Sequence, residues 1–63
     1  MTNHTDPTRT ELIIETMGDR GMFQSECSAD TVSALILELA GSSLSDEDII
    51  DLVVKNFPEE VQP

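Results

Sequence analysis

The chain has 63 residues, of which 13 are acidic and 3 are basic, so its formal net charge is −10 at neutral pH. This length is enough for one domain, and a domain of this size is only marginally stable alone. The acidic surplus argues against direct binding of nucleic acid or an anionic membrane, because both need basic patches. It is compatible with a basic protein partner, with mimicry of DNA, or with simple solubility.

Cys27 is the only cysteine, so an internal disulfide is excluded, and no set of metal ligands accompanies it. This is typical of a reducing compartment. With no signal segment and no long apolar run, we expect a cytoplasmic protein that does not associate with membranes. Tryptophan and tyrosine are absent, so platforms for base stacking and aromatic interface anchors are nearly missing.

The first helix is predicted from a start signal and a stop signal. We expect residues 1–5 to be a disordered tail that precedes a single helical domain over residues 6–57. Asp6 can cap the helix, and Pro7 at its first position loses no needed donor. The helix then runs to the residue before Gly18, which is its predicted stop.

A strand remains an alternative for part of this stretch. Residues 12–14 are three consecutive apolar residues, and two of them are β-branched. In that interpretation, residues 18–21 form a turn to a short second strand at Met22 and Phe23. The start and stop signals favour the helix. Met22 and Phe23 then lie in a loop, where we expect them to be buried against one end of a helical pair.

The second helix is predicted to begin at Ser28 as its N-cap, with Asp30 in the favourable first turn. Gly41 ends it. Placed on a wheel at 100° per residue, most of its apolar side chains share one face, whereas Leu37 falls outside it. The residues on that face are Ala29, Val32, Leu35, Ile36, Leu39 and Ala40.

The start of the third helix is the clearest local signal in the chain. Ser45 resembles the first residue of a capping box, with Asp48 in place of the usual Glu or Gln. Leu44 before the cap and Ile49 after it are placed as a hydrophobic staple. The acidic residues of the first turn suit the helix dipole.

The third helix is predicted to run to about Asn56, because Pro58 ends it near Phe57. Residues 58–63 then form a short acidic tail. The last two helices form an antiparallel hairpin, so we expect an all-α fold of three short helices that self-associates. A homodimer is expected because the apolar arc of the third helix is wider than one partner helix can cover. The candidate self-association residues are Leu37, Ile50, Leu52, Val54 and Phe57.

Residue patterns for catalysis or metal binding are missing. Counted as a calcium loop from Asp46, the sixth and twelfth positions hold Asp51 and Phe57 in place of the required Gly and Glu. His4 has no spaced ligand for zinc and no serine placed for a nucleophilic pair. We therefore expect a non-enzymatic protein with no cofactor and no metal.

Acidic residues off the apolar faces are candidates for binding a basic protein partner. Burial does not explain them, although they can also serve only to keep a dimer soluble. The candidate partner-binding residues on the predicted hairpin are Asp30, Glu38, Glu47, Asp48 and Asp51.

The pattern over residues 12–57 resembles the AriR/YmgB family of small enterobacterial regulators of biofilm and acid resistance. The resemblance includes the loop at residues 21–23, Glu26, the residues from Ser28 to Leu39, and above all residues 44–54. It implies an all-helical dimer that acts as a connector to bacterial signalling systems and carries no catalytic residue. DNA binding is proposed for some members, but the acidic charge of this chain argues against it here.

Two functions follow as hypotheses. The first is a small acidic regulatory protein that acts by protein–protein contact. The alternative is a phage- or plasmid-borne acidic inhibitor that mimics DNA and so blocks a nucleic-acid-binding protein.

Overall fold

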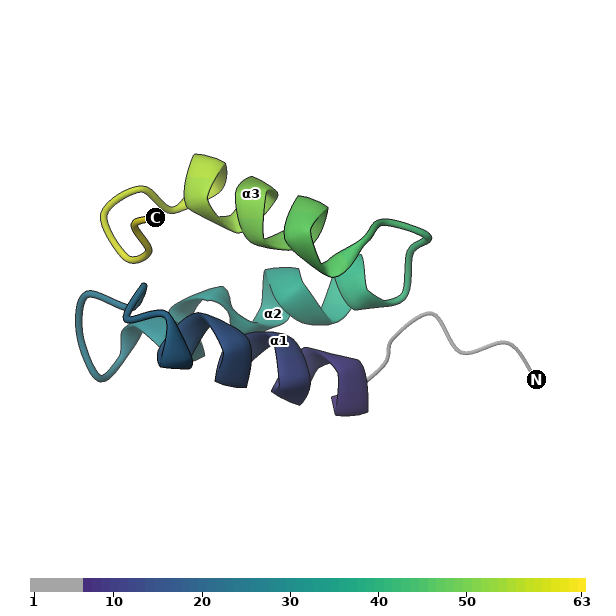
Figure 1. The fold of residues 1–63 in the computed structure, drawn as a ribbon, viewed down its shortest axis with the longest axis horizontal. Coiled ribbons are helices and arrows are strands. Elements are labelled where there is room, and N and C mark those ends of the chain that lie inside the picture. Colours follow the sequence, from purple (N-terminus) through teal and green to yellow (C-terminus); the bar gives the residue numbers. More distant parts are fainter. Residues whose placement is uncertain (1–6) are drawn as a thin grey trace.

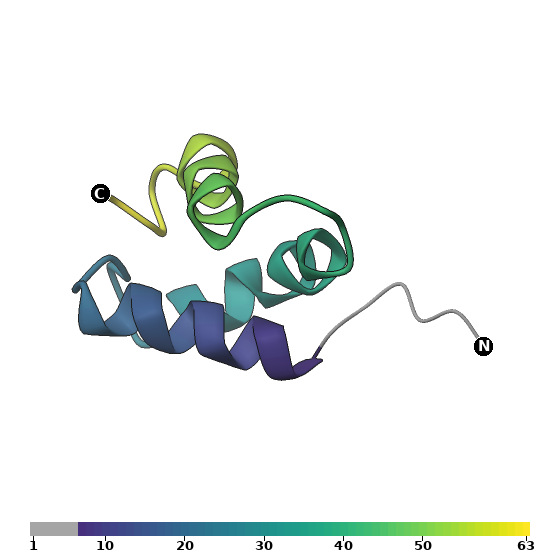
Figure 2. The same ribbon diagram turned by 45° about the vertical axis from the view of Figure 1, so that its right-hand side comes forward.

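A computed structural model describes residues 7–63, which fold into three α-helices around one core (Figure 1). The elements are α1 (Pro7–Asp19), α2 (Ser28–Ala40) and α3 (Asp46–Asn56). α2 and α3 form an antiparallel hairpin, and α1 packs chiefly against α2 (Figure 2). The predicted all-α fold of three short helices is therefore confirmed. The expected tail at residues 1–5 and the expected cap Asp6 lie outside the described residues.

α1 continues through the predicted stop, Gly18, and the chain reverses at Gly21. Gly21 has a φ of 69°, a left-handed conformation that glycine adopts at little cost. Its N–H donates to the carbonyl of Gly18 (3.0 Å), and the N–H of Met22 donates to the carbonyl of Met17 (3.1 Å). This pair of bonds is a Schellman motif. The predicted stop was wrong because the left-handed position falls three residues later, and no strand forms here.

α2 begins at Ser28 rather than after it, so the prediction that Ser28 is the N-cap is wrong. Cys27 holds the capping position and makes no side-chain capping bond. The buried Ser28 hydroxyl makes a tertiary hydrogen bond and a local one instead. It donates to Oε1 of Glu60 (2.9 Å) and accepts from the N–H of Ser25 (3.1 Å). Glu60 lies 32 residues later in the chain, so the sequence around Ser28 does not indicate this contact.

The turn between α2 and α3 agrees with the prediction at both ends. Gly41 follows the last residue of α2, and its N–H donates to the carbonyl of Glu38 (3.2 Å). Ser45 caps α3, and its hydroxyl accepts from the N–H of Asp48 (3.2 Å). α3 then ends at Asn56, before Pro58.

The core is built from one buried stripe on each helix. Successive buried residues on a helix are mostly three or four positions apart, as expected for an amphipathic helix in a small bundle. The loop after α1 closes one end as predicted, because Met22 is buried and Phe23 packs against the core. The buried apolar residues of the helices are Ile13, Met17, Val32, Ile36, Ala40, Ile49, Ile50 and Val53.

Residues 58–63, predicted to be an acidic tail, instead fold back against the loop after α1. Val61 is fully buried and forms an isolated antiparallel bridge with Phe23. The N–H of Gln24 donates to the carbonyl of Glu60, and the N–H of Gln62 donates to the carbonyl of Met22, both at 3.0 Å. The difference arises because the burial of Val61 depends on a partner almost forty positions earlier in the chain.

Candidate functional site

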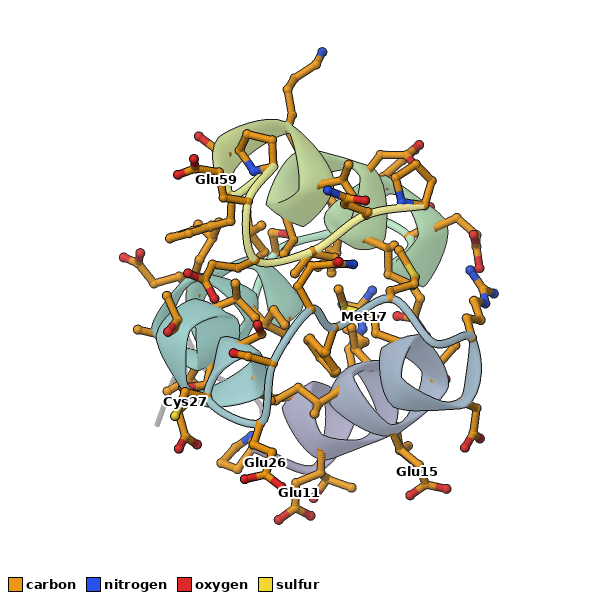
Figure 3. All side chains as sticks on the ribbon, turned by 90° about the vertical axis from the view of Figure 1, so that its left-hand side faces the viewer. Glu11, Glu15, Met17, Glu26, Cys27 and Glu59 are labelled. Atoms are coloured by element: carbon orange, nitrogen blue, oxygen red, sulfur yellow. The ribbon has the colours of Figure 1, made fainter. Side chains whose placement is uncertain are left out.

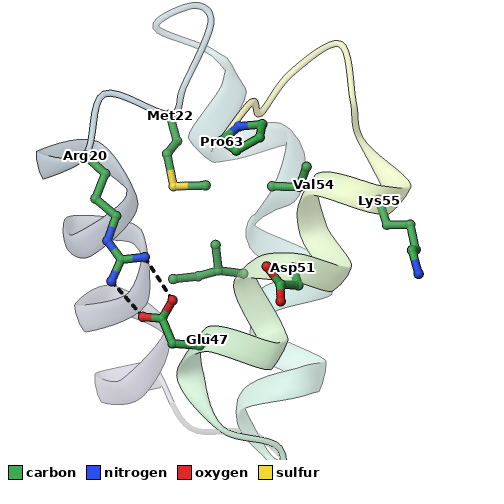
Figure 4. A pocket seen from close by; sticks show the side chains of 8 residues that line it. Arg20, Met22, Glu47, Asp51, Val54, Lys55 and Pro63 are labelled. Atoms are coloured by element: carbon green, nitrogen blue, oxygen red, sulfur yellow. Dashed lines mark hydrogen bonds and ion pairs between the residues drawn. The ribbon is translucent and has the colours of Figure 1, made fainter.

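A groove lies beside α3 (Figure 4). It has a volume of about 640 Å³, which is within the range of sites that hold a small ligand or a few side chains. Met22, Ile50, Val54 and Pro63 supply its apolar surface. Charged side chains from the end of α1 and from α3 surround them, namely Arg20, Glu47, Asp51 and Lys55.

Arg20 and Glu47 form a two-pronged ion pair along one side of the groove. Nη1 of Arg20 donates to Oε1 of Glu47 (3.1 Å), and Nη2 donates to Oε2 (2.6 Å). The hydrogen bonds from Arg20 hold the pKa of Glu47 below its usual value, and the pair raises the pKa of Arg20. Both side chains remain substantially exposed, so solvent screens their attraction.

Asp51 and Lys55 lie one turn apart on α3 at the outer side of the groove. Both are exposed, and neither has an ion pair within residues 7–63. In Figure 4, the Lys55 side chain extends away from Asp51. The groove therefore presents one anion and one cation to the solvent, beside an ion pair whose charges are already matched.

The position of α3, and with it the groove, depends on Arg9 of α1. Its guanidinium donates from Nε to Oδ1 of Asp46 (2.8 Å) and from Nη1 to the carbonyl of Ala40 (3.0 Å). Further bonds go to the carbonyls of Ser42 and Leu44. A single side chain thus binds the end of α2, the connecting turn and the start of α3. Sequence reasoning missed this role because nothing local to Arg9 indicates it.

The predicted partner-binding acids are all exposed, but they do not form one cluster. Glu47 and Asp51 line the groove, and Glu47 forms an ion pair with Arg20. Asp48 is in the first turn of α3 but does not line the groove. Asp30 and Glu38 project from the outer side of α2. The α2 acids are therefore separate from those of the groove.

The predicted self-association residues are divided in a similar way. Ile50 is 3% exposed and belongs to the chain's own core, and it also lines the groove. Val54 is half-buried and lines the groove, whereas Leu52 is 200° around α3 from it at 100° per residue. Leu37 and Phe57 are also half-buried, and Phe57 packs against the core.

A row of acids on α1 was also missed by the sequence analysis. Glu11, Glu15 and Asp19 are exposed and spaced four residues apart, so they follow one side of the helix. Figure 3 shows Glu11 and Glu15 pointing away from the body of the chain. The spacing is visible in the sequence, but the predicted partner-binding acids all lie on the hairpin.

Within residues 7–63, no group of three or more acidic, histidine or cysteine side chains is arranged to hold a metal ion. None of the helices in this part of the chain has the length and apolar character needed to cross a membrane. Comparisons of the chain with protein-family models, curated proteins and solved structures found no match. The site is therefore interpreted from its own geometry.

Proposed function

We propose that this protein is a small, non-enzymatic regulator that acts by protein–protein contact and uses an acidic surface to engage a basic partner. The observation that carries the proposal is the distribution of charge. Both arginines are engaged by acids at the start of α3, which leaves Lys55 as the only base without an ion pair within residues 7–63. Most of the acids are therefore not neutralised by neighbours.

The unpaired acids on α2 support an intermolecular role. Asp30 and Glu38 are exposed and lie on the outer side of α2, where they add nothing to the core. A surface of this kind attracts a basic partner over long range, and the gain in association rate falls as salt screens the charges. The resemblance to AriR/YmgB-like connectors supplies a context for such a partner in biofilm and acid-resistance signalling, and it is consistent with a dimer.

The test is affinity capture from the source organism with mass spectrometry, using the parent and the Asp30→Lys/Glu38→Lys variant. We expect the parent to retain a basic protein at low salt and to lose it as the ionic strength rises above about 0.15 M. The variant should retain much less of that protein while keeping its helix content. Glu11→Lys/Glu15→Lys is the matched control, because it makes the same change in charge on α1. Equal capture by the parent and the α2 variant would contradict the proposal.

A second candidate function, inhibition by DNA mimicry, is favoured by the acidic row on α1. Glu11, Glu15 and Asp19 present carboxylates at intervals of about 6 Å along a straight helix, a regular line of negative charge such as a nucleic-acid-binding groove accepts. In this case the Glu11→Lys/Glu15→Lys variant should lose the partner, and duplex DNA should compete with the parent for it. If added duplex DNA does not reduce capture of the partner, this candidate function is excluded.

A further inference from the structure

We propose that the groove beside α3 is the contact between two copies of this chain, with the α3 helices antiparallel and Asp51 of each copy paired with Lys55 of the other. The inference extends the proposed function, for which the resemblance to AriR/YmgB-like connectors implies a dimer, and it assigns that dimer to one surface. The surface is defined by the groove and by the exposed pair Asp51 and Lys55.

Two charged side chains at the outer side of the groove have no ion-pair partner within residues 7–63. Asp51 and Lys55 are separated by four residues, a spacing at which an acid and a base on one helix can pair. No ion pair joins them in the structure, and Lys55 extends away from Asp51 (Figure 4). Arg9 and Arg20, in contrast, are both engaged within the chain. The one cation without an ion pair in residues 7–63 therefore lies beside an anion that also lacks one.

Asp51 and Lys55 can pair reciprocally between two copies that are related by a two-fold axis. In a two-fold contact, each residue that touches a second residue is touched by that second residue in return. A two-fold axis that is perpendicular to α3 and passes beside it, level with the point midway between Asp51 and Lys55, places each of these residues opposite the other in the partner. Two ion pairs then form from one pair of positions, about 6 Å apart on each helix.

The groove matches a second copy of α3 in both its apolar surface and its charges. Val54 is half-buried at the groove, next to Asp51 and Lys55, and a second α3 would cover it. A basic segment of another protein would meet Arg20 and Lys55 as well as the acids. A second copy presents an acid and a base in reciprocal order. It therefore fits the charged side chains around the groove better than an occupant that carries charge of only one sign.

The overall charge makes the proposal testable against a simpler explanation. Two copies with a net charge of −10 each repel one another at long range. If only this repulsion controlled association, any loss of negative charge would strengthen the dimer. The reciprocal pairing predicts the opposite for Asp51, because Lys at this position would face the partner's Lys55.

The experiment measures dimer dissociation constants by sedimentation equilibrium for the purified full chain at about 0.15 M salt. We expect Asp51→Lys to weaken the dimer at least about tenfold, because it replaces two attractive contacts with two repulsive ones. Asp30→Lys is the matched control: it has the same net charge but lies on α2, so its dimer should be as strong as that of the parent or stronger. The swapped variant Asp51→Lys/Lys55→Asp should return to within about threefold of the parent.

Mixing the single variants gives an independent measurement. Asp51→Lys and Lys55→Asp should each associate poorly alone, yet together they should form heterodimers, because positions 51 and 55 are then both positive in one copy and both negative in the other. Circular dichroism checks that each variant keeps its helices. Should Asp51→Lys lose them, Asp51→Asn and Lys55→Gln test the same contact by removing charge, and each should weaken the dimer less severely.

Three results would overturn the inference: a parent that stays monomeric, Asp51→Lys dimers as strong as those of Asp30→Lys, or no heterodimer from the mixture. A dimer indifferent to Asp51 would place the contact elsewhere. None of these results would decide the proposed regulatory function. That function is tested by a separate experiment, which compares capture of a basic partner by the parent and by the α2 variant.

Discussion

The guanidinium group of Arg9, on α1, binds both the end of α2 and the start of α3. It reaches one carboxylate and three backbone carbonyls across the turn between α2 and α3. The Arg9 side chain is 24% exposed, so its bonds are better shielded from water than those of Arg20, which is 45% exposed. The two arginines of the described chain therefore differ in their expected contribution to stability, although both pair with acids of α3.

Arg9→Ala should lower the free energy of unfolding by about 2 kcal/mol, because it removes several hydrogen bonds from a charged group and leaves partly buried carbonyls unpaired. Arg9→Lys should recover less than half of this loss, since an ammonium group lacks the planar fork that contacts several acceptors at once. The measurement is the urea midpoint. Arg20→Ala is the control and should shift it much less; equal shifts for the two alanine variants would contradict the role assigned to Arg9.

The ion pair at the groove gives a pH dependence with a defined sign. Because Arg20 lowers the pKa of Glu47 in the folded state, protonation of Glu47 favours the unfolded state. The stability that the pair adds is present above the ordinary value of 4.5 and is lost as the pH falls from there through the lowered pKa. The parent should therefore be more stable than Glu47→Gln at neutral pH, and the difference should fade in acid.

Thermal melts of both proteins between neutral pH and about pH 3 measure this difference. Glu38→Gln, which removes an exposed carboxylate without an ion pair in residues 7–63, is the control for the loss of charge alone. A gap between the parent and Glu47→Gln that stays constant into acid would show that the pair does not control the titration.

α3 shows how a single element is fixed by its first residues. Ser45 has extended backbone angles and its hydroxyl accepts the N–H of Asp48, while Asp46, Glu47 and Asp48 place negative charge at the positive end of the helix dipole. Two of these acids also anchor arginines of α1 and of the loop that follows it. The same turn thus caps α3 and positions it against the rest of the chain.

Ser45→Ala should cost about 1 kcal/mol of stability, because it leaves the N–H of Asp48 without its acceptor. Ser43→Ala is the matched control: Ser43 is exposed in the same turn and makes no side-chain hydrogen bond among the described residues, so its effect should be within about 0.5 kcal/mol. Urea unfolding of both variants measures the difference. If the two midpoints agree, the cap does not stabilise α3.

The start of α3 could be predicted because its signals are local: a cap, acids and an apolar staple within a few residues. The end of α1 could not be placed as well, because Gly18 and Gly21 are both suited to stop a helix and only the fold decides which one adopts a positive φ. The groove itself was not predicted, although some of the residues that line it were named for other roles. Glu47 and Asp51 were named as candidates for partner binding and Ile50 and Val54 for self-association, but Arg20, Met22 and Pro63 join them only through tertiary contacts.

The whole molecule is closed by a contact between distant parts of the chain. Val61 fills the end of the helical core, beside Phe23, and the Ser28 hydroxyl holds the same segment through Glu60. A bundle of this size has few buried residues, so each one contributes a sizeable share of its stability. The C-terminal segment is therefore part of the folded unit.

Val61→Ala should destabilise the protein by about 2 kcal/mol, from the lost burial of two methyl groups and the cavity that remains. Gln62→Ala changes an exposed neighbour whose backbone bond to Met22 is retained, so it should have little effect. Thermal melts monitored by circular dichroism compare the two variants with the parent. Equal melting temperatures for all three would mean that the segment is not docked in solution.

The docking of Val61 also bears on when the protein can fold during its synthesis. A chain that is made from its N-terminus completes this core only after Val61 has left the ribosome, since the end of the bundle stays open until then. The hairpin of α2 and α3 can form earlier, because its contacts are local in sequence. A nascent chain that is stalled before Val61 emerges would thus form helices but leave this end of the core open. Met22 and Phe23 would then be accessible to chaperones.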